Sequence, residues 1–185
     1  GLKEKNIIFA LKKMTQIPGR LELVKKINNI KIFVDYAHTP DALEKVLNNL
    51  IEDNKRNITL VFGCGGERDI KKRKMMAKIA SKYCRKVVVT DDNPRYENPK
   101  KIRNTLLKYI AKEKVYDIAN RSKAIYHAIK NSFPGECILI AGKGHETTQD
   151  YGKYILKISD KKIVKQFNKN KILINNDKKI NNFIL

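Results

Sequence analysis

The sequence predicts an α/β fold, a Rossmann-like and mostly parallel sheet with helices on both faces and an N-terminal β-hairpin. Short apolar runs rich in Val and Ile alternate with longer amphipathic stretches, and polar or glycine-rich loops follow the apolar runs. Strands that alternate with helices imply right-handed crossovers and parallel pairing. The expected strands span residues 58–62, 86–90, 114–118 and 136–141, and the expected helices span residues 40–51, 71–83, 99–111 and 121–131.

The two ends of the chain carry further elements. Residues 3–14 predict an amphipathic helix that ends before the Ile-Pro-Gly-Arg break at residues 17–20. The apolar face of this helix comprises Ile7, Ile8, Leu11 and Met14. Two apolar runs, residues 21–26 and 30–36, flank Asn28-Asn29 and predict the hairpin. A last strand at residues 153–158 and a helix at residues 160–168 are expected to close the domain, whereas residues 170–185 are too rich in Asn and Lys to assign.

Composition limits the classes of protein to consider. A length of 185 residues with 42% hydrophobic content suits one good-sized domain with a core. No apolar run approaches the roughly 20 residues that span a bilayer, and the first residues lack the apolar core of a signal peptide. We therefore expect a cytoplasmic protein with no membrane segment. Three cysteines without C-x-x-C spacing indicate reduced, mostly buried thiols rather than disulfides or zinc.

The net charge of +21 does not by itself indicate nucleic-acid binding. Of the 40 basic residues 32 are Lys and 8 are Arg, and Lys, Ile and Asn fill 74 of 185 positions, a pattern typical of A/T-rich coding. Recognition of bases and phosphates favours arginine forks and aromatic platforms, whereas these lysines are scattered and the chain has no Trp. We expect no dedicated nucleic-acid partner, only salt-sensitive binding to polyanions.

Two loops after predicted strands carry candidate binding residues. Residues 35–41 (Asp-Tyr-Ala-His-Thr-Pro-Asp) lead into a helix that Thr or Asp can cap, and a structural and a ligand-binding role are equally open for His38. Residues 63–69 (Gly-Cys-Gly-Gly-Glu-Arg-Asp) expose backbone amides ahead of a helix. Arg68 can hold a carboxylate there through two parallel hydrogen bonds, or form a surface ion pair with a neighbouring acidic residue.

Two further loops carry the remaining charged groups. Residues 91–95 (Asp-Asp-Asn-Pro-Arg) place two carboxylates, an amide and a guanidinium in one turn, which suits either a small zwitterion or a solvated, helix-capping turn. Residues 141–147 (Ala-Gly-Lys-Gly-His-Glu-Thr) allow close backbone approach, and Glu146 offers an anion to an ammonium group. Because strand-to-helix loops of a parallel sheet share one edge, we expect all four loops to converge.

Several signatures of nucleotide and metal chemistry are missing from the sequence. It contains no G-x-x-x-x-G-K-[ST], no G-x-G-x-x-G after a strand and no second histidine at metalloprotease spacing. We therefore expect the chain to hold neither nucleotide phosphates in a P-loop nor a metal.

Five ordered motifs resemble those of the C-terminal domain of the Mur ligases, most closely the members that add diaminopimelate. They are Pro-Gly-Arg at residues 18–20 and the runs at residues 34–43, 62–69, 90–95 and 141–146. The resemblance covers roughly residues 15–168, and five motifs in order are far more specific than any one of them.

The resemblance implies a three-domain ligase of which this chain holds the last domain. The family's N-terminal domain binds a UDP-sugar and its central ATPase domain carries the P-loop; residues 1–14 would be the final helix of that central domain and residues 169–185 a Lys/Asn-rich tail. ATP with Mg2+ phosphorylates the D-glutamate carboxylate of UDP-N-acetylmuramoyl-L-alanyl-D-glutamate, and an amine of meso-2,6-diaminopimelate attacks the acyl phosphate. Both ATP and Mg2+ would be bound mainly by the missing central domain.

The resemblance also implies roles for individual residues. The diaminopimelate pocket would comprise Arg68, Asp92, Asn93, Arg95, Gly142 and Glu146. Three residues would reach the nucleotide when the domains close, namely Arg20, Asp35 and His38. Arg95 would select the distal carboxylate that lysine lacks. No catalytic residue and no metal ligand is expected in this chain.

Other functions stay open at this stage. Without a P-loop the chain alone is expected to be inactive, and it could be a stand-alone diaminopimelate-binding module or a non-catalytic remnant. A basic nucleic-acid-binding protein is the third alternative. The sequence leaves open how strictly diaminopimelate is preferred to lysine, whether the chain is part of a longer protein, and its oligomeric state.

Overall fold

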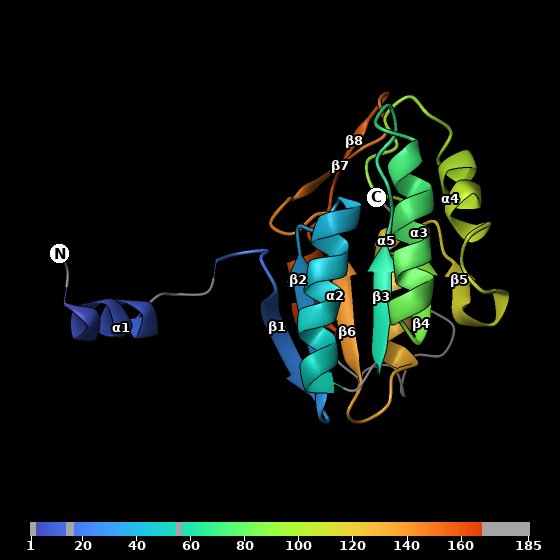
Figure 1. Cartoon of the computed structure of the whole chain (residues 1–185). Helices are drawn as coiled ribbons and strands as arrows, with labels where there is room; N and C mark the ends of the chain where they lie inside the picture. The colour runs from blue at the N-terminus through green and yellow to red at the C-terminus, as the bar shows by residue number, and fades with distance from the viewer. Residues whose placement is uncertain (1–2, 14–16, 55–56, 168–185) are drawn as a thin grey trace.

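The computed structural model describes residues 3–13, 17–54 and 57–167. Within these ranges, six strands form one sheet in the order β1-β2-β6-β3-β4-β5, and β7 pairs with β8 in a separate two-stranded sheet (Figure 1). The strands are β1 (Glu22–Ile27), β2 (Ile30–Asp35), β3 (Ile58–Phe62), β4 (Lys86–Val89), β5 (Val115–Asp117), β6 (Cys137–Ala141), β7 (Thr148–Asp150) and β8 (Ile155–Lys157). The helices are α1 (Glu4–Lys13), α2 (Pro40–Asn54), α3 (Lys71–Tyr83), α4 (Pro99–Leu107), the short η1 (Lys112–Lys114), α5 (Arg121–Lys130) and α6 (Asp160–Gln166).

The predicted N-terminal hairpin is confirmed. β1 pairs antiparallel with β2, and the two residues between them, Asn28 and Asn29, have φ angles of 47° and 62°. A tight turn with positive φ at both central residues matches the right-handed twist of the flanking strands, and Asn tolerates that backbone conformation better than most residues. The other four pairings in the main sheet are parallel.

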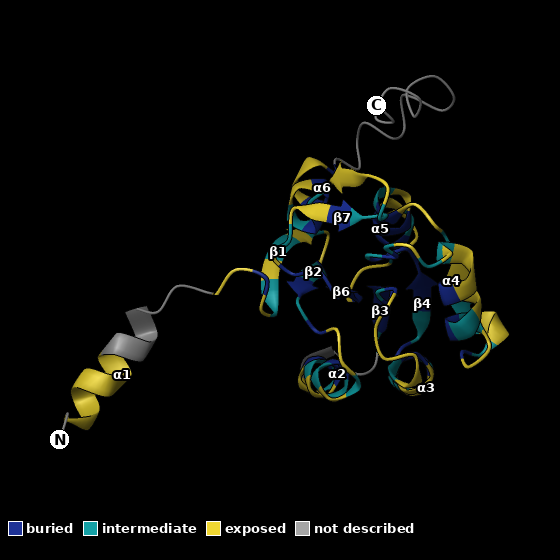
Figure 2. Cartoon of the chain, turned by 90° about the horizontal axis from the view of Figure 1, so that it is seen from above, coloured by how far each residue is buried: buried dark blue, intermediate teal, exposed yellow. Residues whose placement is uncertain are grey.

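Helices cover both faces of the main sheet, as the alternation of elements predicts. The chain moves in one direction across the sheet from β2 to β3, β4 and β5, so right-handed crossovers put α2, α3 and α4 on one face. It then turns back to insert β6 between β2 and β3, which puts α5 on the opposite face beside α6 (Figure 2). This reversal makes the edge near β6 a topological switch point.

The central strands β3 and β6 are buried along their full length. Neighbouring residues serve opposite faces: Leu60 packs into the core beneath α2, α3 and α4, whereas Val61 packs into the core beneath α5 and α6. Burying an aliphatic side chain of this size contributes roughly 1.5–3 kcal/mol. Continuous apolar strands with helices on both sides therefore give the loops at the strand ends a rigid base.

One expected strand forms outside the main sheet, and one expected helix boundary is wrong. The strand expected at residues 153–158 is present as β8, and it pairs with the polar Thr-Gln-Asp segment of β7. The helix expected at residues 99–111 ends at Leu107, since Tyr109 and Ile110 donate their backbone N–H groups three residues back instead of four. The remaining strands and helices lie within a few residues of their predicted bounds.

The N-terminal helix α1 lies apart from the sheet (Figure 1). Its side chains Ile7, Ile8 and Phe9 are exposed by 44%, 44% and 60%. The helix forms where the sequence predicts it, but Met14 and the tail at residues 169–185 fall outside the described residues. None of the helices in the described ranges is long and apolar enough to cross a bilayer.

Candidate functional site

Loops from the carboxyl ends of β2, β3, β4 and β6 surround one cavity of about 390 Å³. This volume lies within the range of roughly 300–1,000 Å³ that is usual for small-molecule sites. The lining includes all six residues predicted to bind the amino acid, namely Arg68, Asp92, Asn93, Arg95, Gly142 and Glu146. His38, one of the three predicted nucleotide-contacting residues, lines it as well. The parallel sheet thus brings together predicted site residues that lie up to 108 positions apart, from His38 to Glu146.

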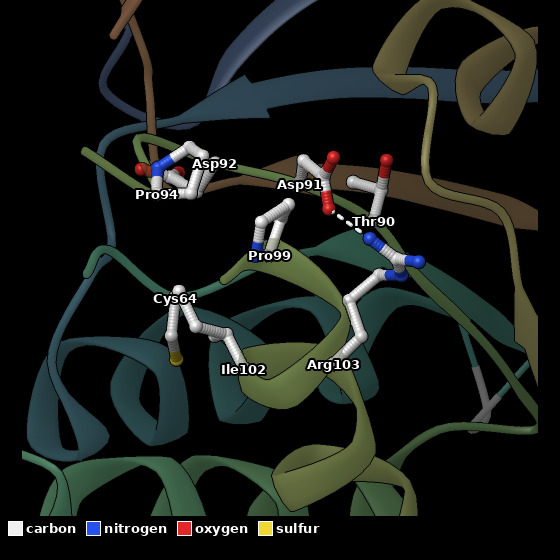
Figure 3. A pocket seen from close by; sticks show the side chains of 8 residues that line it. All are labelled: Cys64, Thr90, Asp91, Asp92, Pro94, Pro99, Ile102 and Arg103. Carbon is white, nitrogen blue, oxygen red and sulfur yellow. Dashed lines mark hydrogen bonds and ion pairs between the residues drawn. The ribbon is translucent and has the colours of Figure 1, made fainter. Parts of the chain in front are cut away.

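The turn at residues 91–95 is held from behind through Asp91. This buried carboxylate accepts a hydrogen bond from Arg103 on α4, and its other oxygen accepts one from the Tyr151 hydroxyl at 2.9 Å. Figure 3 shows Asp91 pointing to Arg103 and away from Pro94. The space around Asp91 and Arg103 has no room for a water-sized molecule, so α4 packs closely against the turn. The hydrogen bond between these two residues holds the turn to α4.

Asp92 lies on the cavity side of the same turn. Its Oδ1 accepts a hydrogen bond from the backbone N–H of Asn93 at 2.7 Å. Its Oδ2 lies only 2.8 Å from the position that a Cβ on Gly142 would take. Gly142 also has a φ of +110°, which L side chains rarely adopt. Glycine is therefore required here for two independent reasons, the backbone conformation and the close approach of Asp92.

Arg95 is anchored to the glycine-rich loop after β3. Its Nη1 donates to the carbonyl oxygens of Gly66 and Asn93, at 2.9 and 3.3 Å. The two backbones approach so closely that a Cβ on Gly66 would lie 1.9 Å from the carbonyl oxygen of Pro94. Arg95 itself adopts a φ of 53°. The guanidinium is thereby fixed at the cavity wall, while the exposed Arg68 faces the same cavity from the other loop.

A second ion pair supports the glycine loop from α3. Arg73, which is 2% exposed, donates from both terminal nitrogens to the carboxylate of Glu97 at 2.7 Å and also to the Gly65 carbonyl oxygen at 3.2 Å. The backbone N–H of Glu67 donates to the same carboxylate. The hydrogen bonds from Arg73 lower the pKa of Glu97, and burial opposes this only partly.

Glu146 and Asn93 meet at the back of the cavity. Asn93 Nδ2 donates to Glu146 Oε2 at 3.2 Å, and the ammonium group of Lys143 donates to both side chains. Burial raises the pKa of Glu146, but the hydrogen bonds from Lys143, Asn93 and Tyr36 outweigh it and hold that pKa below its usual value. Glu146 is therefore a carboxylate at neutral pH.

The three residues predicted to reach a nucleotide differ in their surroundings. The Arg20 guanidinium lies over the Tyr36 ring, 4.7 Å from its centre, and His38 Nδ1 pairs with the Tyr36 carbonyl oxygen at 2.8 Å. Asp35 is buried, and its two oxygens accept the backbone N–H groups of Leu21 and Ala37. Arg20 and His38 are exposed beside the cavity, whereas Asp35 holds the loop that carries them.

Three contributors to the site were not singled out by the motif reasoning. Tyr36 and Lys72 line the cavity, and Lys72 Nζ donates to the His38 carbonyl oxygen at 3.2 Å. Lys143 was noted only for its flanking glycines, yet it is 1% exposed and paired. Tyr36 and Lys143 stand inside quoted motifs, so the signal was present; nothing in the sequence marks Lys72 among the other lysines of α3.

Cys64 also lines the cavity, but as a thiol. It is 4% exposed, and burial raises its pKa to about 12. All three cysteines of the chain are buried thiols, as predicted. Among the described residues, no three His, Cys, Asp or Glu side chains gather as a potential metal site.

Two arginines, a lysine, three carboxylates and an amide line one cavity at the carboxyl edge of the parallel sheet, so charges of both signs converge where α/β domains usually bind ligands. The sequence pattern of the Mur ligase glutamate ligase domain matches residues 19–144. The chain therefore belongs to the Mur ligase family, as its five motifs predict.

The relatives of the chain include ligases that are named for diaminopimelate. It is 43% identical over 169 residues to the UDP-N-acetylmuramoyl-L-alanyl-D-glutamate–2,6-diaminopimelate ligase of Rickettsia typhi, covering 90% of this chain and 34% of the relative. It is 40% identical over 166 residues to the ligase of the same name from Bacillus cereus, covering 90% and 34%. The chain thus spans about a third of the length of these relatives.

Solved structures agree with this relationship. A structure of a UDP-N-acetylmuramoyl-L-alanyl-D-glutamate–2,6-diaminopimelate ligase is similar with a TM-score of 0.75 and 33% identity, covering 89% of this chain and 34% of that protein. A folylpolyglutamate synthase of Mycobacterium tuberculosis matches with a TM-score of 0.62 over 76% of this chain and 33% of that protein. At 20% identity the second likeness concerns the fold alone.

Proposed function

We propose that the cavity binds meso-2,6-diaminopimelate for an ATP-dependent ligase of peptidoglycan synthesis. The ligase would join this amino acid to UDP-N-acetylmuramoyl-L-alanyl-D-glutamate, and this chain would be its C-terminal, amino-acid-binding domain in the cytoplasm. One observation carries the proposal: the six residues that the motifs assign to the amino acid all line one cavity. The names of the relatives support the choice of ligand.

The charges around the cavity suit a molecule with a carboxylate and an amine at each end. Arg68 and Arg95 would each meet a carboxylate, and Asp92 and Glu146 would meet an ammonium group. Since Arg95 Nη1 is committed to backbone carbonyl oxygens, the other edge of its guanidinium, where Nε lies 3.9 Å from Asp150 Oδ2, would take the ligand. Lysine lacks the second carboxylate, so it would leave one of the two arginines without a partner from the ligand.

The chain's own part in the reaction would be to deliver an amine. Bound ATP with Mg2+ would supply the acyl phosphate on the D-glutamate carboxylate of the other substrate. The cavity would hold diaminopimelate with one amine pointing at that carbonyl carbon, and attack would form the amide bond as phosphate leaves. Domain closure would exclude water, which would otherwise hydrolyse the acyl phosphate.

Nucleotide and metal would be bound mainly by a central domain of the whole protein. Within this chain, Arg20 and His38 are the exposed groups that fit contact with a nucleotide across the closing domains. A direct contact from Asp35 stays a prediction, because both its oxygens already accept backbone N–H groups. The exposed apolar face of α1 fits packing against the same central domain.

Calorimetric titration of the chain with diaminopimelate and with lysine tests this function. We expect the parent chain to prefer diaminopimelate, and Arg95→Ala to lose about 10- to 100-fold of its affinity for diaminopimelate but little of its affinity for lysine, because the lost bidentate pair contributes roughly 1.5–3 kcal/mol. Lysine is the matched control, since it differs from diaminopimelate only by the distal carboxylate. Equal binding of diaminopimelate by Arg95→Ala and the parent chain would reject the assignment of this pocket.

A further inference from the structure

A buried lysine lies directly behind the cavity. Lys143, between Gly142 and Gly144, is 1% exposed, and its Nζ donates to Asn93 Oδ1 at 2.9 Å and to Glu146 Oε2 at 2.8 Å. Removing an ammonium group from water is costly unless good partners compensate for the lost hydration. Here both compensating partners are residues of the proposed amino-acid pocket.

The surroundings of Asn93 determine which way its amide points. The backbone N–H of Asp150 donates to Asn93 Oδ1 at 3.0 Å, in addition to the Lys143 ammonium group. Both are donors only, so the atom that they share must be the oxygen, and Nδ2 then points to Glu146. With its oxygen already accepting two hydrogen bonds, Asn93 can offer a ligand only its remaining N–H. It therefore suits a carboxylate and not an ammonium group.

Glu146 is held by the same ammonium group. Its Oε2 accepts from both Lys143 and Asn93, at 2.8 and 3.2 Å, which fixes the orientation of the carboxylate. Lys143 reaches Asn93 on the loop after β4 from the loop after β6, so it also ties together two loops of the cavity that come from strands separated in the sheet by β3.

We propose that Lys143 is a positioning residue for the amino-acid pocket, which presents Asn93 as a donor to a ligand carboxylate and holds Glu146 as the partner of a ligand ammonium group. This inference rests on the proposed function, because it assigns Lys143 to the same pocket. With 1% of its surface exposed, Lys143 acts through Asn93 and Glu146 and does not touch the ligand.

The pairing can be tested without any ligand. In a ¹⁵N-labelled chain, a buried and hydrogen-bonded lysine ammonium group exchanges its hydrogens with water slowly, whereas exposed ammonium groups exchange fast. We expect a lysine ammonium resonance near neutral pH that disappears in Lys143→Gln and shifts in Glu146→Gln. A spectrum in which neither variant alters any such resonance would overturn the proposal.

Calorimetry with diaminopimelate tests the consequence for binding. We expect Lys143→Met to lose about tenfold or more in affinity, since it leaves Asn93 and Glu146 without their common donor. The loss should grow from about pH 8 to about pH 5, because Glu146 keeps its interaction with Arg121 but loses the hydrogen-bonded cation and so becomes protonated at a higher pH. Lys143→Gln should recover part of the affinity near pH 8 through its amide N–H but keep the altered pH profile.

Glu136→Gln is the matched control for a lost buried charge. Glu136 lies at the opposite edge of the sheet, where it accepts hydrogen bonds from Thr59 and Arg85. It should lower the melting temperature without changing affinity or its pH profile. Affinity in Lys143→Met and Lys143→Gln equal to that of the parent chain at every pH would overturn the proposal. If the parent chain itself did not bind diaminopimelate, the proposed function would fail, and the ammonium resonance would still decide whether Lys143 holds the two side chains.

Discussion

Asp91 and Asp92 are neighbours in the chain and face opposite sides of the same turn. Asp91 points into the protein, to Arg103 and Tyr151, whereas Asp92 lines the cavity beside Gly142. The inward carboxylate stabilises the turn, and the carboxylate on the cavity side lies 3.9 Å from the buried Arg121 guanidinium. A pair of identical residues thus has two different surroundings, which a motif written as D-D-N-P-R does not distinguish.

A substitution at Gly142 should affect the fold and the pocket together. Gly142→Ala forces a side chain into a φ of +110° and places its Cβ 2.8 Å from Asp92 Oδ2. We expect a loss of about 1–3 kcal/mol in stability from backbone strain and a weaker affinity for diaminopimelate because Asp92 is displaced. Thermal unfolding and calorimetric titration measure the two effects.

Gly135 provides the control for strain alone. It also has a positive φ, 87°, but a Cβ there would meet nothing within 4 Å. Gly135→Ala should therefore lose stability and keep its affinity. Equal affinities of the two variants would contradict the close contact between Gly142 and Asp92.

At the level of single residues, the sequence motifs named the lining of the cavity but not its support. The six amino-acid-binding candidates line one cavity, although their roles stay a proposal. The sequence did not predict that Lys143 and Arg121 are buried, because a charged side chain is ordinarily exposed. Only the three-dimensional packing reveals their burial. Each also has a partner that is distant in sequence, Asn93 for Lys143 and Asp160 on α6 for Arg121.

At the scale of elements, buried arginines on three helices tie the cavity loops to the body of the domain. Arg73 on α3 holds the glycine loop and Glu97, and Arg103 on α4 holds Asp91. Arg121 on α5 forms two hydrogen bonds of 2.8 Å with Asp160 and one of 3.0 Å with the Ala141 carbonyl oxygen, just before Gly142. The three helices α3, α4 and α5 thereby position three different loops, which follow β3, β4 and β6 respectively.

The Arg73–Glu97 pair predicts a measurable dependence of stability on pH. Glu97→Gln should lower the free energy of unfolding by about 2 kcal/mol at neutral pH, since hydrogen bonds to charged groups contribute roughly 1.5–3 kcal/mol. The pKa of Glu97 is lowered below its ordinary 4.5, so its ionised form favours the folded state above the unfolded pKa. The difference between parent and variant should therefore shrink as the pH falls below 4.5 and vanish once the pH is below the folded pKa.

Denaturant unfolding at several pH values measures this difference. Glu113→Gln, on the exposed short helix η1, is the control and should change stability little at any pH. A Glu97→Gln effect that stayed constant down to acidic pH would show that the ion pair does not stabilise the loop.

The sequence predicted the strong elements and missed the weak ones. Apolar runs such as β3 and β6 and long amphipathic helices such as α3 are visible in the sequence because their hydrophobic periodicity is pronounced. β7 has three residues, Thr-Gln-Asp, and no apolar alternation, so only its pairing with β8 makes it a strand. The end of α4 was misplaced because Ile110 is apolar and buried, although it lies in a turn beyond the helix.

At the scale of the whole molecule, the site is formed by loops that follow early and late strands of the sheet. The cavity lining runs from Tyr36 to Glu146 in the sequence. The insertion of β6 between β2 and β3 brings these segments to the same edge of the sheet. The site so formed matches the charges of the proposed amino acid, and the sequence contains no P-loop motif.

We expect the chain alone to release no phosphate from ATP. Mixed with Mg2+, ATP, UDP-N-acetylmuramoyl-L-alanyl-D-glutamate and diaminopimelate, it should give a phosphate signal equal to that of buffer, because its 185 residues contain no G-x-x-x-x-G-K-[ST]. The same preparation should bind diaminopimelate by calorimetry, which shows that it is folded. Turnover above the buffer level would refute the assignment of the ATP site to another domain.

The position of β6 in the chain also bears on how the domain is made. Among the described strands, β6 alone joins the β1-β2 pair to β3, β4 and β5, yet it is the last of the six to be synthesised. Until Ala141 has left the ribosome, the parallel edges of β2 and β3 stay unpaired, with Val34 and Val61 exposed. Long-range parallel pairing is intrinsically slow, and open apolar edges invite aggregation. The late insertion of β6 creates the edge that carries the cavity. It also requires that β6 be synthesised before the β1-β2 pair and the β3-β4-β5 strands associate with other chains.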